Sequence, residues 1–324
     1  MYPIRRKRRL RKSAALRDLV QETHIHPHDF IVPLFVVEGK SVKEEIPSMP
    51  NICRLRLDEL QKDVRLLWKM GLKGVLVFAK VEDRLKDNAG TEALNPDGLM
   101  QRAIQTIKAT VPEIVVFSDV ALDPYSSFGH DGIVENNTIV NDATIDVLAQ
   151  MALSHAQSGA DVVAPSDMMD GRVMHIRKAL ENSGFPDTCI MSYAAKYASS
   201  FYGPFRDALD SAPGFGNKKT YQMNPANRKE SMDEVLLDIE EGADLVMVKP
   251  GLAYLDILRD LRNTIDVPLA VYQVSGEYAM LRAAAEKGWL DYETVMMEQL
   301  LAFKRAGASI IASYSAKDAV TLLN

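Results

Sequence analysis

An apolar run that ends on a lysine is where chemistry is first expected in this sequence. The stretch LVMVKPG covers residues 245–251, and Lys249 follows residues that favour a buried strand and precedes Pro250. A lysine at a strand end can extend its amine into solvent. Alternatively, its surroundings keep the amine partly neutral, so that it can act as a nucleophile. The segment alone favours the first interpretation, so the choice between the two depends on the rest of the chain.

Further reactive side chains follow or end other short runs of strand-forming residues. These are Asp119 in 114–120, Ser166 and Asp167 after 161–165, Lys196 after 188–193, Ser275 after 268–272 and Tyr314 at the end of 309–314. If the runs are parallel strands of one barrel, these side chains share the rim where barrel enzymes carry out catalysis. Stability alone does not require two lysines there. We therefore interpret Lys249, Lys196 and Asp119 as catalytic.

Two amines near each other favour their neutral forms. Each cation disfavours protonation of the other, Arg206 and Lys218 on the intervening loop add to this, and partial burial acts in the same direction. Lowering a lysine pKa from about 10.4 to about 7 takes roughly 4.6 kcal/mol. The neutral amine then attacks a ketone, and the resulting Schiff base acidifies the adjacent carbon.

The elements that must position these residues alternate regularly along the chain. Runs with strand character occur at 30–37, 74–79, 114–120, 161–165, 188–193, 243–248, 268–272 and 309–314. Most are continuously apolar, which is typical of parallel strands covered on both faces. Segments with helical spacing lie between them at 57–71, 143–159, 229–242, 276–288 and 292–307. This alternation predicts an α/β fold.

The predicted architecture is a single (β/α)8 TIM barrel with an extended N-terminal arm. An open doubly wound sheet is the alternative, but no Gly-rich loop follows the first strand. Residues 1–29 form the arm, with a short helix capped by Ser13, and residues 30–324 form the catalytic barrel. We expect the basic arm to contact another subunit rather than nucleic acid.

Composition excludes several classes of protein. The 324 residues are 47% hydrophobic with a net charge of −6, as in a soluble globular protein without nucleic acid as its main partner. Cys53 and Cys189 lie far apart, which argues against disulfides and a cysteine zinc site. No apolar stretch approaches the ~20 residues that span a bilayer. The basic start lacks the apolar core of a secretory signal, and we expect a cytoplasmic protein.

Motifs through nearly the whole chain resemble the porphobilinogen synthase family, also called 5-aminolaevulinate dehydratase. They are MVKPGLAYLDILRD (247–260), YQVSGEYAML (272–281), SYAAKYASSFYGPFRDA (192–208) and APSDMMDGRV (164–173). The resemblance implies the condensation of two 5-aminolaevulinate molecules to porphobilinogen, with loss of two waters, in tetrapyrrole synthesis. It also implies a homo-octamer built from arm-swapped dimers.

The resemblance also implies a role for each site residue. Lys249 would form the Schiff base with the substrate that becomes the propionate half, and Lys196 with the substrate that becomes the acetate half. The carboxylate of the second substrate would be held by Arg206 and by Lys218, where the family often has arginine. Ser275 and Tyr314 would bind the other carboxylate. The Gly- and Pro-rich loop 211–224 is predicted to close over the substrates.

The segment SDVALDPYSSFGHDG (118–132) departs from the zinc-dependent members of the family. Their three cysteines match Ala121, Asp123 and Asp131, so a site here suits Mg²⁺ or a monovalent ion, if it holds a cation at all. His130 is either a ligand or an ordinary hydrogen-bonding loop residue. Glu234 matches a glutamate that binds an activating Mg²⁺ through waters, although acids at a helix start also favour its dipole. We expect Mg²⁺, no zinc and no organic cofactor.

Two other functions fit parts of the sequence. A class I aldolase also places a Schiff-base lysine on a barrel strand, but it normally needs one such lysine. A binding protein whose basic arm engages nucleic acid would show strong, salt-dependent affinity, which nothing in the barrel predicts.

Overall fold

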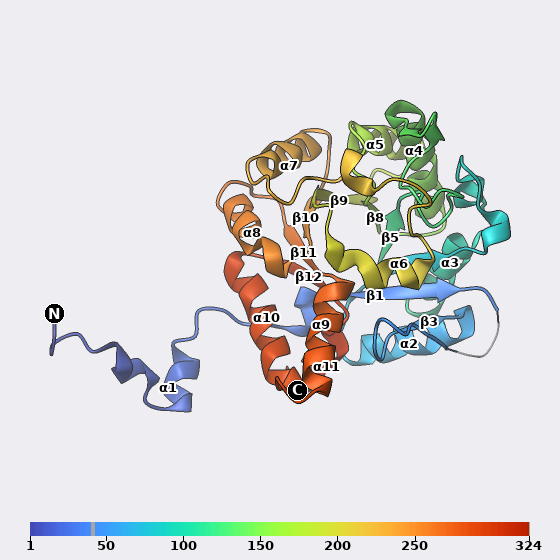
Figure 1. The fold of residues 1–324 in the computed structure, drawn as a ribbon. Coiled ribbons are helices and arrows are strands. Elements are labelled where there is room, and N and C mark those ends of the chain that lie inside the picture. The colour runs from blue at the N-terminus through green and yellow to red at the C-terminus, as the bar shows by residue number, and fades with distance from the viewer. Residues whose placement is uncertain (40–42, 324) are drawn as a thin grey trace.

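A closed parallel barrel forms the body of the chain in this computed structural model, which describes residues 1–39 and 43–323 (Figure 1). Within these ranges its eight strands are β1 (Phe30–Val37), β4 (Gly74–Lys80), β5 (Val115–Val120), β8 (Val162–Pro165), β9 (Cys189–Lys196), β10 (Leu245–Lys249), β11 (Leu269–Gln273) and β12 (Ile310–Ser313). Neighbouring strands pair in chain order, and β12 pairs with β1. This closure confirms the TIM barrel, and the open-sheet alternative is wrong.

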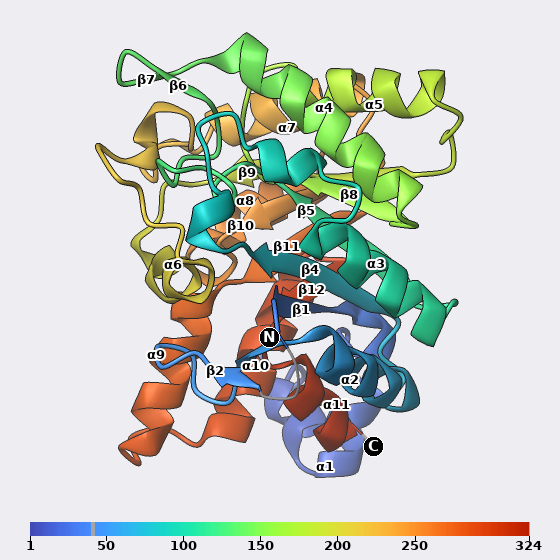
Figure 2. The same ribbon diagram turned by 90° about the vertical axis from the view of Figure 1, so that its right-hand side faces the viewer.

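Helices surround the barrel (Figure 2). They are α2 (Leu57–Lys69), α3 (Leu99–Thr110), α4 (Asn141–Gln157), α5 (Arg172–Asn182), α6 (Gly203–Leu209), α7 (Glu230–Glu240), α8 (Leu255–Arg262), α9 (Ser275–Glu286), α10 (Tyr292–Ala306) and α11 (Ala316–Leu323). Short strands β2 (Glu44–Glu45) and β3 (Cys53–Leu55) extend the sheet beside β1, and β6 (Val134–Glu135) pairs with β7 (Thr138–Ile139). The predicted helices all form, with ends that differ by at most two residues.

Helix α2 shows why these segments are helical. Leu60, Val64 and Leu67 recur at helical spacing and are fully buried against the barrel. Acidic residues occupy its first turn, where they favour the helix dipole. The helix is followed by Gly71 at φ +89°, a left-handed conformation that ends helices and favours glycine.

Strand residues alternate between two apolar layers. On β10, Met247 packs inside the barrel, whereas Val246 and Val248 pack under the helices. The same alternation places Phe117 of β5 inside. Burial on both faces explains why the strands read as continuous apolar runs rather than alternating ones.

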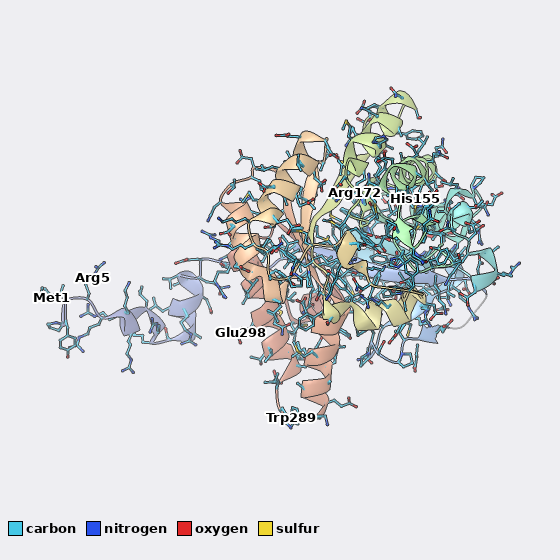
Figure 3. The ribbon with its side chains drawn as sticks, turned by 45° about the horizontal axis from the view of Figure 1, so that its top comes forward. Met1, Arg5, His155, Arg172, Trp289 and Glu298 are labelled. Carbon is cyan, nitrogen blue, oxygen red and sulfur yellow. The ribbon has the colours of Figure 1, made fainter. Side chains whose placement is uncertain are left out.

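The N-terminal segment extends away from the barrel (Figure 1). Its helix α1 (Ala14–Leu19) begins at Ser13, whose hydroxyl accepts a hydrogen bond from the Leu16 amide. Figure 3 shows Met1 and Arg5 far from the barrel. The chain becomes buried at Ile25, and an ion pair of 2.9 Å joins Asp29 to Lys304 of α10. Among the described residues, no helix is both long and apolar enough to cross a membrane.

Candidate active site

Lys249 is the last residue of β10 and faces the barrel interior. Strand alternation from Met247, which packs inside, sets this direction. Only 4% of Lys249 is exposed. The lysine therefore does not extend its amine into solvent.

Lys196 reaches the same rim through an irregularity in β9. Tyr193 packs inside the barrel, but both Ala194 and Ala195 pack on the outer layer. The register against β10 shifts there, because β9 carries one extra residue between the paired positions. Lys196 consequently faces inward and pairs directly with Lys249 across the two strands. Its strand, predicted to end at residue 193, continues to Lys196.

Aromatic rings surround the amine of Lys249. Its Nζ lies 4.7 Å from the ring centroid of Tyr272, 4.8 Å from Phe205, 4.9 Å from Tyr193 and 5.3 Å from Tyr202. Rings attract an ammonium but do not replace its water shell. Burial, assisted by the charge of Lys196 and opposed by Asp119, lowers the pKa of Lys249 to about 7. A large fraction of the amine is therefore neutral near pH 7.

Lys196 has a different environment from Lys249. Its Nζ donates to the carbonyl oxygen of Ser166 and lies 3.3 Å from Oδ2 of Asp131. The two lysines are thus neighbours with distinct partners, one among rings and one at a carboxylate. Such a difference suits two amines with different chemical tasks.

Lys218 forms ion pairs with both aspartates that are candidate cation ligands. Its Nζ lies 2.6 Å from Oδ1 of Asp131 and 3.1 Å from Oδ2 of Asp123. Burial disfavours the charged form of Lys218, but the two aspartates outweigh burial and raise the pKa of Lys218. Burial likewise raises the pKa of Asp131, but Lys196 and Lys218 outweigh it and bring that pKa to about 2. An ammonium thus occupies the place between these carboxylates, and the pair as arranged here does not fit a metal ion.

Asp119 is a buried carboxyl on the inner face of β5. Burial, with the charge of Asp123, raises its pKa to about 7. Its Oδ1 has no hydrogen-bond partner among the described residues. Asp119 and Lys249 therefore each gain or lose a proton near the same pH, which is a property of groups that act as acids and bases.

The predicted substrate-binding residues lie around these lysines. Arg206 of α6 and Lys218 line one cavity of about 20 Å³ with Lys196, Lys249 and Asp123. Ser275 is buried at the start of α9, where its hydroxyl accepts from the Phe205 amide (2.9 Å) and donates to the Phe201 carbonyl (3.3 Å).

Tyr272 connects Tyr314 to the amine of Lys249. The two tyrosine hydroxyls are 2.9 Å apart, and the Tyr272 ring contacts the amine. Tyr314 therefore belongs to the cluster of side chains around Lys249.

The loop 211–224 packs over residues 128–130. The Gly214 amide donates to the Phe128 carbonyl (2.8 Å). His130 uses both ring nitrogens, at 3.0 Å from the Tyr221 hydroxyl and 3.0 Å from the Phe215 carbonyl oxygen. His130 is thus a hydrogen-bonding residue that fastens the loop in this structure, and the side chain of Ala121 offers no ligand atom.

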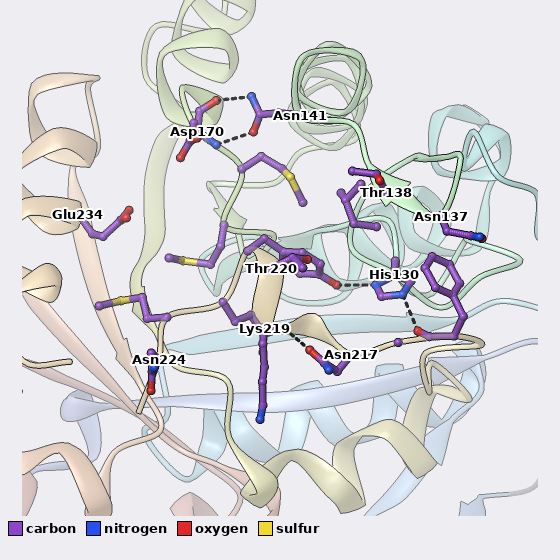
Figure 4. Close-up of a pocket in the computed structure, with 18 of the residues that line it drawn as sticks. His130, Asn137, Thr138, Asn141, Asp170, Asn217, Lys219, Thr220, Asn224 and Glu234 are labelled. Atoms are coloured by element: carbon purple, nitrogen blue, oxygen red, sulfur yellow. Dashed lines mark hydrogen bonds between the residues drawn. The ribbon is translucent and has the colours of Figure 1, made fainter. Parts of the chain in front are cut away.

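Glu234 lies apart from the lysines, on a cavity of about 660 Å³. Figure 4 shows it at the left of the cavity, with Asp170 and Asn141 above it and Asn137 on the opposite side. Burial raises the pKa of Glu234, while Arg172 opposes the rise. In the described ranges no group of three or more His, Cys, Asp or Glu side chains is arranged to hold a metal. Glu234 therefore fits only an ion that keeps most of its water, as Mg²⁺ does.

Sequence reasoning missed the rings around Lys249. Tyr193 and Tyr272 occupy inward-facing strand positions next to the lysines, so strand alternation could have found them. Phe205 and Tyr202 come from the segment after β9, where alternation gives no signal.

Comparisons with known proteins cover almost the whole chain. A sequence profile described as "ALAD: Delta-aminolevulinic acid dehydratase" matches residues 4–322. The delta-aminolevulinic acid dehydratase of Bacillus subtilis is 51% identical over 98% of both chains. The chloroplastic protein of Glycine max is 54% identical over 98% of this chain and 78% of its own length.

A solved structure extends the likeness to three dimensions. The delta-aminolevulinic acid dehydratase (porphobilinogen synthase) of Toxoplasma gondii, in complex with porphobilinogen, superimposes with a TM-score of 0.97 at 50% identity. The match covers 99% of this chain and 92% of the other.

Proposed function

We propose a residue-level mechanism from the premise that the chain belongs to the delta-aminolevulinic acid dehydratase family, whose members are also named porphobilinogen synthases. The chain is thus a lyase that converts 5-aminolaevulinate to porphobilinogen. Family membership removes the aldolase alternative and the alternative that the chain is a binding protein rather than an enzyme. The observation that carries the mechanism is the adjacency of Lys249 and Lys196 in different environments at one rim.

Lys249 is the nucleophile toward one substrate. With a pKa of about 7, its neutral amine attacks the C4 ketone, and loss of water gives a Schiff base. The iminium withdraws electrons from the C3–H bond. Asp119, whose pKa is also raised to about 7, is the group that accepts this proton.

Lys196 forms the second Schiff base, with the substrate that becomes the acetate half. Asp131 holds its amine, so substrate binding must separate this pair or move a proton across it. Arg206 and Lys218 bind the carboxylate of this substrate, which requires Lys218 to leave Asp123 and Asp131. Ser275 and Tyr314 bind the other substrate's carboxylate through their hydroxyls.

The loop 211–224 acts as a lid. A cavity of about 20 Å³ holds about one water and cannot accept two substrates. Lys218 lies on this loop, and the loop is fastened to residues 128–130. Displacement of this loop therefore opens the site and moves Lys218 at the same time.

Glu234 would hold an activating Mg²⁺ through waters, and the ion would supply positive charge at the edge of the 660 Å³ cavity. The catalytic residues need no zinc, because no thiolate lies in the 118–132 loop, and no organic cofactor is required. Asp123 and Asp131 become available to a cation only when Lys218 leaves them.

The exposed basic arm joins subunits, and the assembly is an octamer of arm-swapped dimers in the cytoplasm. The arm supports this proposal because nearly all of residues 1–24 are exposed in the single chain. Its helix therefore has an unused surface that another copy can bury.

Borohydride reduction with 5-aminolaevulinate, followed by mass mapping, tests the mechanism. Lys249 and Lys196 should carry the reduced adduct, and Lys249→Ala should fold but lose turnover almost entirely. The exposed Lys219, beside Lys218, should stay unlabelled and serves as the internal control. Labelling of other lysines in place of Lys249 would overturn the assignment.

A further inference from the structure

Glu277 is a buried carboxylate just outside the described cluster. None of its surface is exposed. Its Oε2 accepts from the Val274 amide (2.9 Å), and its Oε1 accepts from the Leu252 amide (2.7 Å). The backbone N–H groups of Gly251 and Ala253 also favour its charged form, although burial is the larger effect and raises the Glu277 pKa to about 7. These bonds satisfy a charge that would otherwise be costly to bury.

The bonds of Glu277 join two segments that carry substrate-binding residues. Residues 251–253 are separated by one residue from Lys249, which ends β10. Val274 follows β11 and is the N-cap residue before Ser275, the first residue of α9. Capping α9 alone would require only the bond from Val274. The bonds to 251–253 tie this helix start to the Lys249 strand.

Close packing leaves both segments little freedom. A Cβ on Gly251 would lie 2.6 Å from the Phe303 ring, so this backbone rests against α10. A Cβ on Gly276 would lie 2.5 Å from the Phe201 carbonyl oxygen, so the start of α9 rests against that backbone. Glu277 thus connects the segment after Lys249, which packs against α10, to the start of α9, which packs against the Phe201 backbone.

We propose that Glu277 is a positioning residue that fixes Ser275 relative to Lys249, so that one substrate engages its ketone and its carboxylate together. The proposal rests on the roles assigned above to Lys249 and Ser275. Two methylene groups separate the carboxylate of 5-aminolaevulinate from its ketone. A substrate of fixed length binds at both ends only if the two protein groups keep a fixed separation.

Two ketones distinguish positioning from a merely structural role. One is 4-oxopentanoate, the substrate without its amino group, and the other is 2-pentanone, which has a methyl group in place of the carboxylate. Each is trapped at Lys249 with cyanoborohydride and quantified by mass mapping, at a pH well above the Glu277 pKa of about 7. The ratio of the two trapping rates measures how well the carboxylate is used.

Glu277→Gln places an amide NH₂ against backbone N–H groups and removes the charge. The trapping ratio should fall about tenfold to a hundredfold, the effect of losing a hydrogen bond to a charged group, while 2-pentanone trapping stays unchanged. Ser275→Ala should cause a similar fall, and the double variant should fall no further. Glu286→Gln, the same change at the exposed end of α9, should leave the ratio unaltered.

Several results would overturn the proposal. A wild-type ratio in Glu277→Gln, or equal loss of trapping with both ketones, would show that Glu277 does not set the Ser275 position. Glu277→Asp provides a second variant, and failure of both to fold would make Glu277 a fold determinant only. If wild-type Lys249 is not trapped at all, the Lys249 assignment itself fails, and this proposal with it.

Discussion

The lowered pKa of Lys249 can be tested by removing one of its causes. A decrease from 10.5 to about 7 is 3.5 pKa units, or about 5 kcal/mol. At a pH of about 8, roughly 90% of such an amine is neutral, against about 0.3% of an unperturbed lysine. Burial is the largest cause, and the charge of Lys196 is the next.

Lys196→Met removes this second cause. Side chains on adjacent strands start about 5 Å apart, and two amines roughly 6 Å apart at an effective dielectric constant of about 20 repel by about 3 kcal/mol. Asp131 already offsets part of the Lys196 charge. We therefore expect the pKa of Lys249 to rise by about 1 to 2, and to remain below 10.5 because burial persists.

The assay is the pH dependence of cyanoborohydride trapping of 4-oxopentanoate at Lys249. The wild-type inflection should lie near 7 and move to higher pH in Lys196→Met. Lys219→Met, a change at an exposed lysine next to Lys218, should leave it in place. The electrostatic reasoning would be refuted if the wild-type trapping rate had its inflection near pH 10. It would also be refuted if the inflection of Lys196→Met stayed at the wild-type pH.

Asp131→Asn should lower the free energy of unfolding by about 3–5 kcal/mol in urea titrations, because two buried ammonium groups lose their carboxylate. The native pKa of Asp131 is depressed, so the carboxylate stabilises the folded protein above about pH 4, and this contribution is lost as the pH falls towards 2. An acid unfolding transition in Asp131→Asn like that of the wild type would contradict this. Deleting residues 1–22 should leave a folded barrel of smaller assembly mass by light scattering, and an unchanged mass would argue against the arm as a subunit contact. Activity should survive 1,10-phenanthroline, fall with EDTA and return with Mg²⁺, and in Glu234→Ala the Mg²⁺ response should weaken while basal turnover persists. Inactivation by phenanthroline that only zinc reverses would contradict the metal assignment.

Much of the fold could be predicted because it depends on local pattern. Apolar runs buried on both faces, helical spacing between them and a glycine after α2 are properties of short segments. These patterns predicted every barrel strand, and the predicted and observed strand ends differ by at most three residues. Barrel closure itself was inferred from the number of units, and the pairing of β12 with β1 confirmed it.

The candidate site was predictable in its membership but not in its contacts. The sequence placed Lys249, Asp119, Ser275 and Tyr314 near strand ends, and a barrel gathers strand ends at one rim. It did not predict that Lys218 pairs with Asp123 and Asp131, because these residues are at least 87 positions apart. Pairing over such separations depends on which loops the fold brings together.

Lys196 shows most clearly what could not be predicted from the sequence. Simple alternation from Tyr193 would point Lys196 outward, towards the helices. The extra residue at Ala194–Ala195 reverses the direction, and Lys196 faces Lys249. The sequence by itself determined that a lysine follows closely on this predicted strand and that two lysines lie near one rim. Only the tertiary structure decided that Lys196 also points into the barrel. A bulge forms where the pairing of β9 with β10 accommodates one extra residue, and that pairing is a property of two strands rather than one.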